Sequence, residues 1–238
     1  MTTLKILKND EFAFERRKLP HFPFCFLTFK DMDEALKMAY EVKDISHSGM
    51  QLLLKDGVPN FSTGDNIEGH IHWKGSDLKI TGEVQWVNKA RLGIKFDEKL
   101  KADILEFLSE ENILKSIHPM HDDHLGIELP GNLKYWLHAD GPVDLFMWGH
   151  LDGEWEEFQI ILFKSFVEWK DGEGVRTGVV LTKRNLETPL FEQDEFVFQM
   201  DGELNNNKLQ AVRSLVEKLS DDFLPSHVID FLKLKLGD

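Results

Sequence analysis

Two polar stretches in the N-terminal half decide how this sequence is interpreted: ERRKLPHFPF, residues 15–24, and DISHSG, residues 44–49. Residues 41–54 alternate as strand, turn and strand around the second stretch. That turn offers one carboxylate, two hydroxyls and a glycine, which permits a positive φ or a close ligand approach. The first stretch is basic, and a guanidinium binds phosphate bidentately and stacks on a base. Together they predict a site for an anionic ligand.

Short strands with turn signals between them continue beyond this turn. Residues 66–73 alternate, and residues 78–87 and 91–96 are two further strand-like segments. From Leu100 to Leu114 the apolar residues follow helical spacing. The pattern predicts a closed barrel or a sandwich that is followed by a helix.

The two stretches resemble the PilZ family, which binds the bacterial second messenger cyclic-di-GMP. The family pattern has two arginines separated by three residues before a strand, then Asp or Asn, any residue, Ser, two residues and Gly. Asp44, Ser46 and Gly49 match the second motif, and Arg17 takes the leading arginine position of the first. The resemblance implies a six-stranded antiparallel β-barrel over residues 15–117, including the late strands at residues 82–87 and 93–96.

The resemblance also implies which residues bind the dinucleotide. Arg16 and Arg17 would contact phosphate and stack on guanine, Asp44 would accept from a guanine edge, and Ser46 and Gly49 would shape the turn. His21 stands at the second arginine position. A histidine is shorter than arginine and mostly neutral near pH 7, so it can stack but offers no bidentate fork. Losing one charge-assisted pair weakens binding by about ten- to a hundred-fold.

Two functional hypotheses therefore stay open, and both are non-catalytic. In the first, the protein is a cyclic-di-GMP-responsive signalling effector that passes the change to a protein partner through its second half. In the second, favoured by His21, it is a degenerate PilZ adaptor that acts by protein–protein contact in pilus or flagellar motility. An enzyme regulated by the barrel is a third alternative, but the sequence has no P-loop, dinucleotide fingerprint or nucleophile elbow.

The net charge of −14 is concentrated in the second half. Residues 1–120 hold 17 Lys/Arg against 19 Asp/Glu, whereas residues 121–238 hold 11 against 23. An acidic surface repels polyanions, so we expect no DNA or RNA partner, and an anionic ligand belongs in the first half. We find no export signal and no apolar run of membrane-spanning length, and therefore expect a cytoplasmic protein. Cys25, the single cysteine, lies in an apolar run and is expected in a core.

The second half, residues 125–238, predicts an acidic β-rich domain of no recognised family with two terminal helices. The expected helices are residues 207–219 and 228–236, after a linker at residues 116–123. The expected strands are residues 134–139, 143–150, 158–169, 174–182 and 195–200.

Two clusters, one in and beside the linker and one in the second half, resemble functional sites but are better explained structurally. His118, His121 and His124 supply metal-ligand side chains, but Pro119 argues against one helix holding three imidazoles on one side, so no metal site is expected. The carboxylates at residues 154, 156 and 157 follow a glycine turn and are typical of a solvent-facing hairpin.

Overall fold

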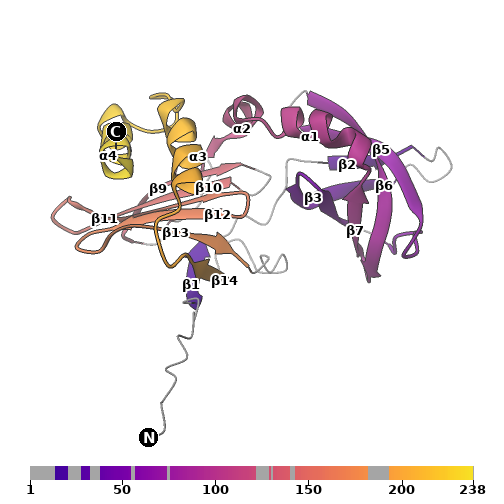
Figure 1. Ribbon diagram of the computed structural model, residues 1–238, viewed down its shortest axis with the longest axis horizontal. Helices are drawn as coiled ribbons and strands as arrows, with labels where there is room; N and C mark the ends of the chain where they lie inside the picture. Colours follow the sequence, from indigo (N-terminus) through magenta and orange to yellow (C-terminus); the bar gives the residue numbers. More distant parts are fainter. Residues whose placement is uncertain are drawn as a thin grey trace, which may run out of the picture.

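The computed structural model describes residues 14–20, 28–32, 38–54, 57–73, 76–121, 129, 131–139, 143–181 and 193–237. It shows two β-rich lobes, one with a barrel and one with a broad curved sheet covered by helices (Figure 1).

The first lobe is a closed six-stranded antiparallel barrel with the strand order β2-β3-β4-β7-β6-β5. Its strands alternate buried and exposed residues, as Ile67, Gly69, Ile71 and Trp73 show on one side of β5. The predicted barrel is confirmed. Its strands are β2 (Thr28–Asp31), β3 (Ala39–Ser46), β4 (Gly49–Leu53), β5 (Asn66–Trp73), β6 (Ser76–Asn88) and β7 (Arg91–Phe96).

A helical segment follows the barrel, as its apolar spacing predicts, but it is divided. A 3₁₀ turn (η1, Glu98–Leu100) leads into α1 (Lys101–Phe107) and α2 (Glu110–Ser116). Ser109 is extended, with φ −66° and ψ 156°, and this breaks the helix between the two pieces. Helix α1 packs on the barrel through Phe107, whose ring centroid lies 5.6 Å from that of Trp73.

The second lobe is an eight-stranded sheet with the order β1-β14-β13-β12-β11-β10-β9-β8. It is antiparallel throughout. Its strands are β1 (Phe14–Pro20), β8 (His118–Pro119), β9 (Leu133–Ala139), β10 (Val143–Gly149), β11 (Trp155–Leu162), β12 (Ser165–Lys170), β13 (Gly174–Val180) and β14 (Gln193–Met200).

Two C-terminal helices, α3 (Asn206–Glu217) and α4 (Ser226–Leu236), cover one face of this sheet (Figure 1). Asn205 caps α3, because its side chain accepts hydrogen bonds from two backbone N–H groups in the first turn of the helix. The opposite face has its own apolar cluster, which includes Trp136 and Phe166. The expected β-rich unit with two terminal helices is confirmed.

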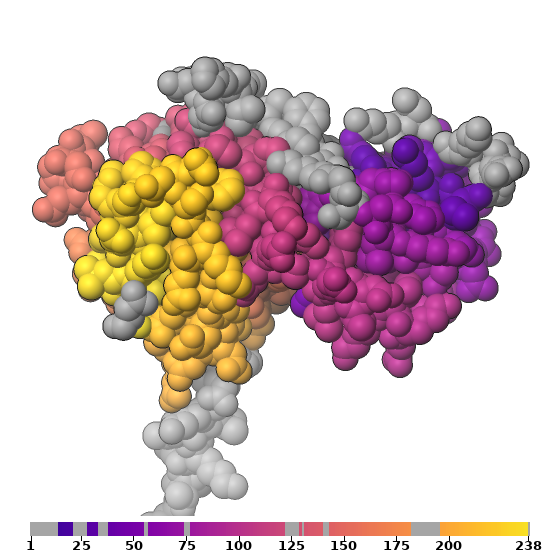
Figure 2. All heavy atoms as spheres, turned by 90° about the horizontal axis from the view of Figure 1, so that it is seen from above, coloured from indigo at the N-terminus to yellow at the C-terminus, as the bar shows by residue number. Residues whose placement is uncertain are grey.

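The two lobes join through the α1–α2 region, drawn in magenta between them in Figure 2. Glu110 of α2 accepts hydrogen bonds from Ser214 of α3 (2.9 Å) and from Lys218, the C-cap residue of the same helix. One apolar cluster runs from the barrel through Ile113 and Ile117 to the helix-covered face of the sheet. The barrel and the second sheet therefore share a buried core.

Three further details differ from the expectations. The linker predicted at residues 116–123 contains β8, which pairs with β9. The single strand predicted at residues 158–169 is a hairpin that turns at Phe163 and Lys164. Strand β1 lies within the predicted 15–117 unit by sequence, but it pairs with β14 of the second sheet. The division of the chain at residues 117 and 125 stays a prediction.

Candidate functional site

The DISHSG stretch forms the tight turn between β3 and β4. Ser46 Oγ donates to the Gly49 carbonyl (3.2 Å) and accepts from the Ser48 N–H (3.4 Å). At Gly49, an added Cβ would lie 2.3 Å from the Ile94 carbonyl oxygen on β7. The serine therefore holds the turn, and the glycine lets two strands approach closely.

This turn lines a surface pocket of about 350 Å³, which we call the corner pocket. Asp44, Ser46 and Gly49 line it. Trp86 of β6 and Lys95 of β7, two other strands of the same barrel, line it as well. The three motif residues are thus brought together, beside an aromatic ring and a cation.

Trp86 is a pocket residue that the sequence analysis did not identify as functional. Its side chain is large and apolar, yet the residue is 38% exposed. The indole lies over Gly93, where an added Cβ would be 2.2 Å from Trp86 Nε1. An exposed indole held in place by a glycine on the next strand is a stacking surface for a flat ligand. The sequence feature that indicates this site is a tryptophan on one late strand and a glycine on the next, which pair with each other in the barrel.

The basic stretch lies elsewhere, on β1 in the second sheet. Because neighbouring strand residues point to opposite faces, Arg16 and Arg17 are separated. Arg16 is exposed, whereas Arg17 lies on the same side as the buried Leu19. In this conformation the two guanidinium groups cannot approach one ligand from the same face.

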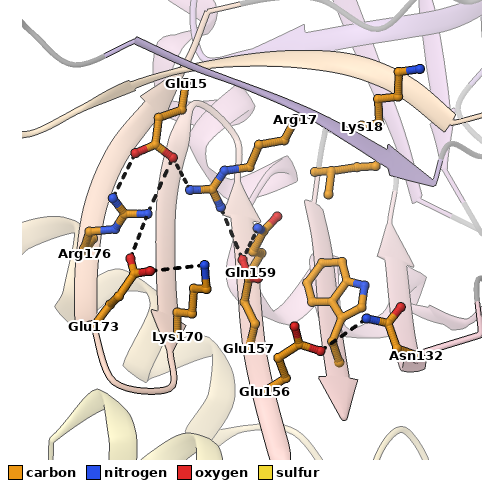
Figure 3. A pocket seen from close by; sticks show the side chains of 12 residues that line it. Glu15, Arg17, Lys18, Asn132, Glu156, Glu157, Gln159, Lys170, Glu173 and Arg176 are labelled. Atoms are coloured by element: carbon orange, nitrogen blue, oxygen red, sulfur yellow. Dashed lines mark hydrogen bonds and ion pairs between the residues drawn. The ribbon is translucent and has the colours of Figure 1, made fainter. Parts of the chain in front are cut away.

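Arg17 belongs to a group of paired carboxylate and guanidinium side chains. We call this group the Arg17 network, and its members are Glu15, Arg17, Glu157, Glu168 and Arg176. Its guanidinium donates to both oxygens of Glu168, one at 3.0 Å, as well as to Glu157 (3.3 Å) and Glu15. The Glu168 side chain is fully buried, and Arg176 reaches it at 2.5 Å. Figure 3 shows most of these side chains between β1 and the strands below it.

Two aromatic rings complete the surroundings of this guanidinium. Its central carbon lies 5.4 Å from the ring centre of Phe166 and 5.6 Å from that of Phe198. Such cation–π contacts strengthen when they are shielded from water. Arg17 of β1 therefore contacts side chains of three other strands of the second sheet, β11, β12 and β14.

Ionisation in the Arg17 network follows from burial and charge. Burial alone lowers the pKa of Arg17, but hydrogen bonds and charge from Glu168 and Glu15 outweigh it, and its pKa is raised. Burial alone raises the pKa of Glu15, but Arg17 and Arg176 outweigh it and its pKa is lowered. Burial raises the pKa of Glu157. The hydrogen bond from Gln159 and the charge of Arg17 lower it by less, so the pKa of Glu157 is raised overall.

The raised pKa of Glu157 predicts a pH dependence of stability. Between its ordinary value of 4.5 and its higher folded value, the folded state holds more proton than the unfolded chain. Stability from this group is therefore lost as pH rises through that window. We expect the free energy of unfolding of Glu157→Gln, measured in urea from pH 4 to 8, to improve relative to wild type as pH rises. A constant difference across the range would contradict this.

The Arg17 network borders a second pocket of about 510 Å³, lined by Glu15, Arg17, Glu157 and Arg176 among others (Figure 3). None of the residues lining this pocket lines the corner pocket. The structure thus brings Asp44, Ser46 and Gly49 together and places Arg17 at a separate pocket. His21 lies outside the described residues, as does Cys25.

The two clusters set aside from the sequence occupy the second lobe. His118 lies on β8, His121 contacts the backbone of Trp136, and His124 is outside the described residues. Within the described part of the chain, no group of three metal-ligating side chains is found. Glu157, interpreted as a solvent-facing hairpin residue, is instead partly buried in the Arg17 network. Among the described residues no helix has the length and apolarity needed to cross a bilayer.

Comparisons with known proteins identify the first half of the chain. A search of curated proteins and a search of solved structures give no match. Residues 14–110 match the family model of the PilZ domain. The matched residues include β1, the whole barrel and the barrel side of the corner pocket. The chain therefore contains a PilZ domain.

Proposed function

We propose that this protein is a cyclic-di-GMP-responsive, non-catalytic signalling effector that acts in the cytoplasm and passes ligand binding to a protein partner through its second half. PilZ domains belong to a family of non-catalytic cyclic-di-GMP receptors. The observation that carries the proposal is the corner pocket, in which Asp44, Ser46 and Gly49 lie together on a barrel of the right family.

The chemistry of the corner pocket suits a guanine nucleotide. The Asp44 carboxylate can accept hydrogen bonds from the N–H groups on a guanine edge. Trp86 offers a face on which the base can stack. Lys95 supplies positive charge for a phosphate. Ser46 and Gly49 keep the turn tight enough for the ligand to approach its backbone.

Arg17 can bind the ligand only if its side chain leaves the conformation described above, and this movement is the proposed switch. If Arg17 is to reach the ligand, its side chain must leave Glu168, Glu157 and Glu15. Each charge-assisted hydrogen bond lost costs about 1.5–3 kcal/mol, so the exchange is near neutral only if phosphate oxygens accept as many in return. Glu168 keeps Arg176 as a partner at 2.5 Å, so its buried charge stays partly compensated.

Such an exchange of partners by Arg17 would connect ligand binding at the barrel to the second lobe. A ligand shifts a conformational equilibrium only by its differential affinity for the two states. Here one state has Arg17 bound to the second sheet, and the other has it bound to the dinucleotide. The cyclic-di-GMP level would thus decide how firmly β1 is tied to the second lobe, which is the proposed partner-binding unit.

The position of Arg17 also favours a second candidate function, the degenerate adaptor. In that alternative Arg17 is a permanent structural residue of the second sheet, and with His21 in place of the other arginine no guanidinium pair serves the ligand. The protein would then act by protein–protein contact alone, in pilus or flagellar motility.

Calorimetry with cyclic-di-GMP separates the two candidates. Saturable binding to the full chain at micromolar or tighter affinity, lost in Asp44→Ala, supports the effector. Asp77→Ala is the matched control, because Asp77 is an exposed carboxylate on β6 that does not line the corner pocket. The absence of binding heat and of competition by the nucleotide would support the adaptor.

Replacing His21 with arginine should restore the missing fork of the family motif. We expect cyclic-di-GMP to bind His21→Arg about ten- to a hundred-fold more tightly than wild type, because one charge-assisted phosphate contact is gained. His21→Lys is the control for charge without the planar fork, and it should gain less. If both variants bind as wild type does, position 21 does not contact the ligand.

A further inference from the structure

The turn between β11 and β12 has a conformation that its sequence does not favour. Leu162 pairs with Ser165, so the connection consists of Phe163 and Lys164 alone. Phe163 has φ +57°, in the left-handed region that two-residue turns usually give to glycine or asparagine. A bulky side chain rarely adopts it, and such outliers concentrate at functional sites.

This turn of the second lobe lies directly against the DISHSG turn of the barrel. The ring centroids of Phe163 and His47 are 5.4 Å apart. Lys164 lines the corner pocket together with Asp44 and the rest of the motif. Its backbone is fixed, because the Val180 N–H donates to the Lys164 carbonyl at 2.9 Å. A rigid hairpin of the second sheet thus presents an exposed lysine to the PilZ pocket.

The charges that line the corner pocket show what this lysine can bind. Among the residues that the structure describes, the cations lining it are Lys95 from the barrel and Lys164 from the second lobe, while Arg17 is held at the other pocket. Asp44 is suited to a base edge, so a phosphate has to be neutralised by the two lysines. A dinucleotide with two phosphates fits a pocket that offers one cation from each lobe.

We infer that Lys164 is a phosphate-binding residue of the corner pocket, so that the ligand site is shared between the PilZ barrel and the second lobe. This inference rests on the proposed cyclic-di-GMP binding and assigns it a residue outside the PilZ domain match. A ligand held by both lobes adds a connection between them. The hairpin of β11 and β12 then transmits binding into the sheet that also holds Arg17.

The test compares Lys164→Ala with Lys101→Ala in calorimetric titrations of the full chain with cyclic-di-GMP. Lys101 is an exposed lysine at the start of α1 that does not line the corner pocket, so it controls for the loss of one positive charge. We expect Lys164→Ala to weaken binding about ten-fold or more, because one charge-assisted phosphate contact is lost. Lys164→Arg, which keeps the charge, should bind within a few-fold of wild type.

Hydrogen exchange at residues 162–165 and thermal melting complete the test. Cyclic-di-GMP should protect these residues in wild type but not in Lys164→Ala, while the melting temperature of the unliganded variant stays unchanged. If wild type binds and Lys164→Ala binds equally well, the inference is overturned while the proposed function stands. If wild type does not bind cyclic-di-GMP, both fail. If Lys101→Ala weakens binding as much as Lys164→Ala does, Lys164 acts only through general charge and the inference is also overturned.

Discussion

Arg17→Ala should destabilise the protein by about 3–5 kcal/mol, whereas Arg16→Ala, one residue earlier, should cost less than about 1 kcal/mol. Breaking a buried ion pair from one side is costly because it leaves the other charge uncompensated. Glu168 is fully buried and would retain only Arg176, while Glu157 would lose its contact with Arg17. Arg16 is exposed on the opposite face of the same strand, which makes it the matched control.

Urea unfolding of both variants measures this difference directly. Tryptophan fluorescence follows this transition mainly in the second lobe, which holds four of the six tryptophans, the buried Trp136 and Trp169 among them. The loss of the cation–π contacts with Phe166 and Phe198 adds to the effect. Equal stabilities of the two variants would show that the Arg17 network contributes little to folding.

The same pair of variants shows which arginine serves the ligand. If Arg17 exchanges partners, Arg17→Ala loses cyclic-di-GMP binding even under conditions in which it is fully folded. If the outward-facing Arg16 is the ligand contact, Arg16→Ala loses binding with no loss of stability. The structural and the ligand-binding roles of the basic stretch are thereby separated.

The barrel could be predicted because its information is local. Alternation in residues 66–73, the strand–turn–strand pattern of residues 41–54 and the DISHSG turn each specify structure within a few residues. The close approach at Gly49 follows from the same short motif. For these reasons the motif residues of the corner pocket were identified together.

The partner of β1 could not be predicted because its pairing joins residues that are far apart in the chain. Arg17 bonds with Glu157 and Glu168, which are 140 and 151 residues away. In sequence, Glu168 is one carboxylate in the strand SFVEWK, and nothing local shows that it is fully buried. A basic arm beside an acidic second half was interpreted as a ligand arm, although the acidic half itself contains its present partners.

The hairpin at Phe163 escaped prediction for the opposite reason, since its turn residues contradict the local rules. Residues 158–169 contain no glycine, proline or asparagine and were therefore interpreted as one strand. Tertiary contacts, including the ring contact with His47, support a left-handed phenylalanine there. The feature that the sequence conceals is the one that carries Lys164 to the corner pocket.

Gly49→Ala should destabilise the barrel by about 2–3 kcal/mol and abolish ligand binding, because the new methyl group meets backbone rather than a movable side chain. Its Cβ would lie 2.3 Å from the Ile94 carbonyl oxygen, where β4 pairs with β7. Relief requires the two strands to separate where Gly49 pairs with Lys95, and both of these residues line the corner pocket. Gly202→Ala is the control: nothing lies within 4 Å of its added Cβ, so its stability should stay equal or rise by up to about 1 kcal/mol. Thermal unfolding and calorimetry of both variants measure the two effects, and a Gly49→Ala protein that melts and binds as wild type does would disprove the close approach at this corner.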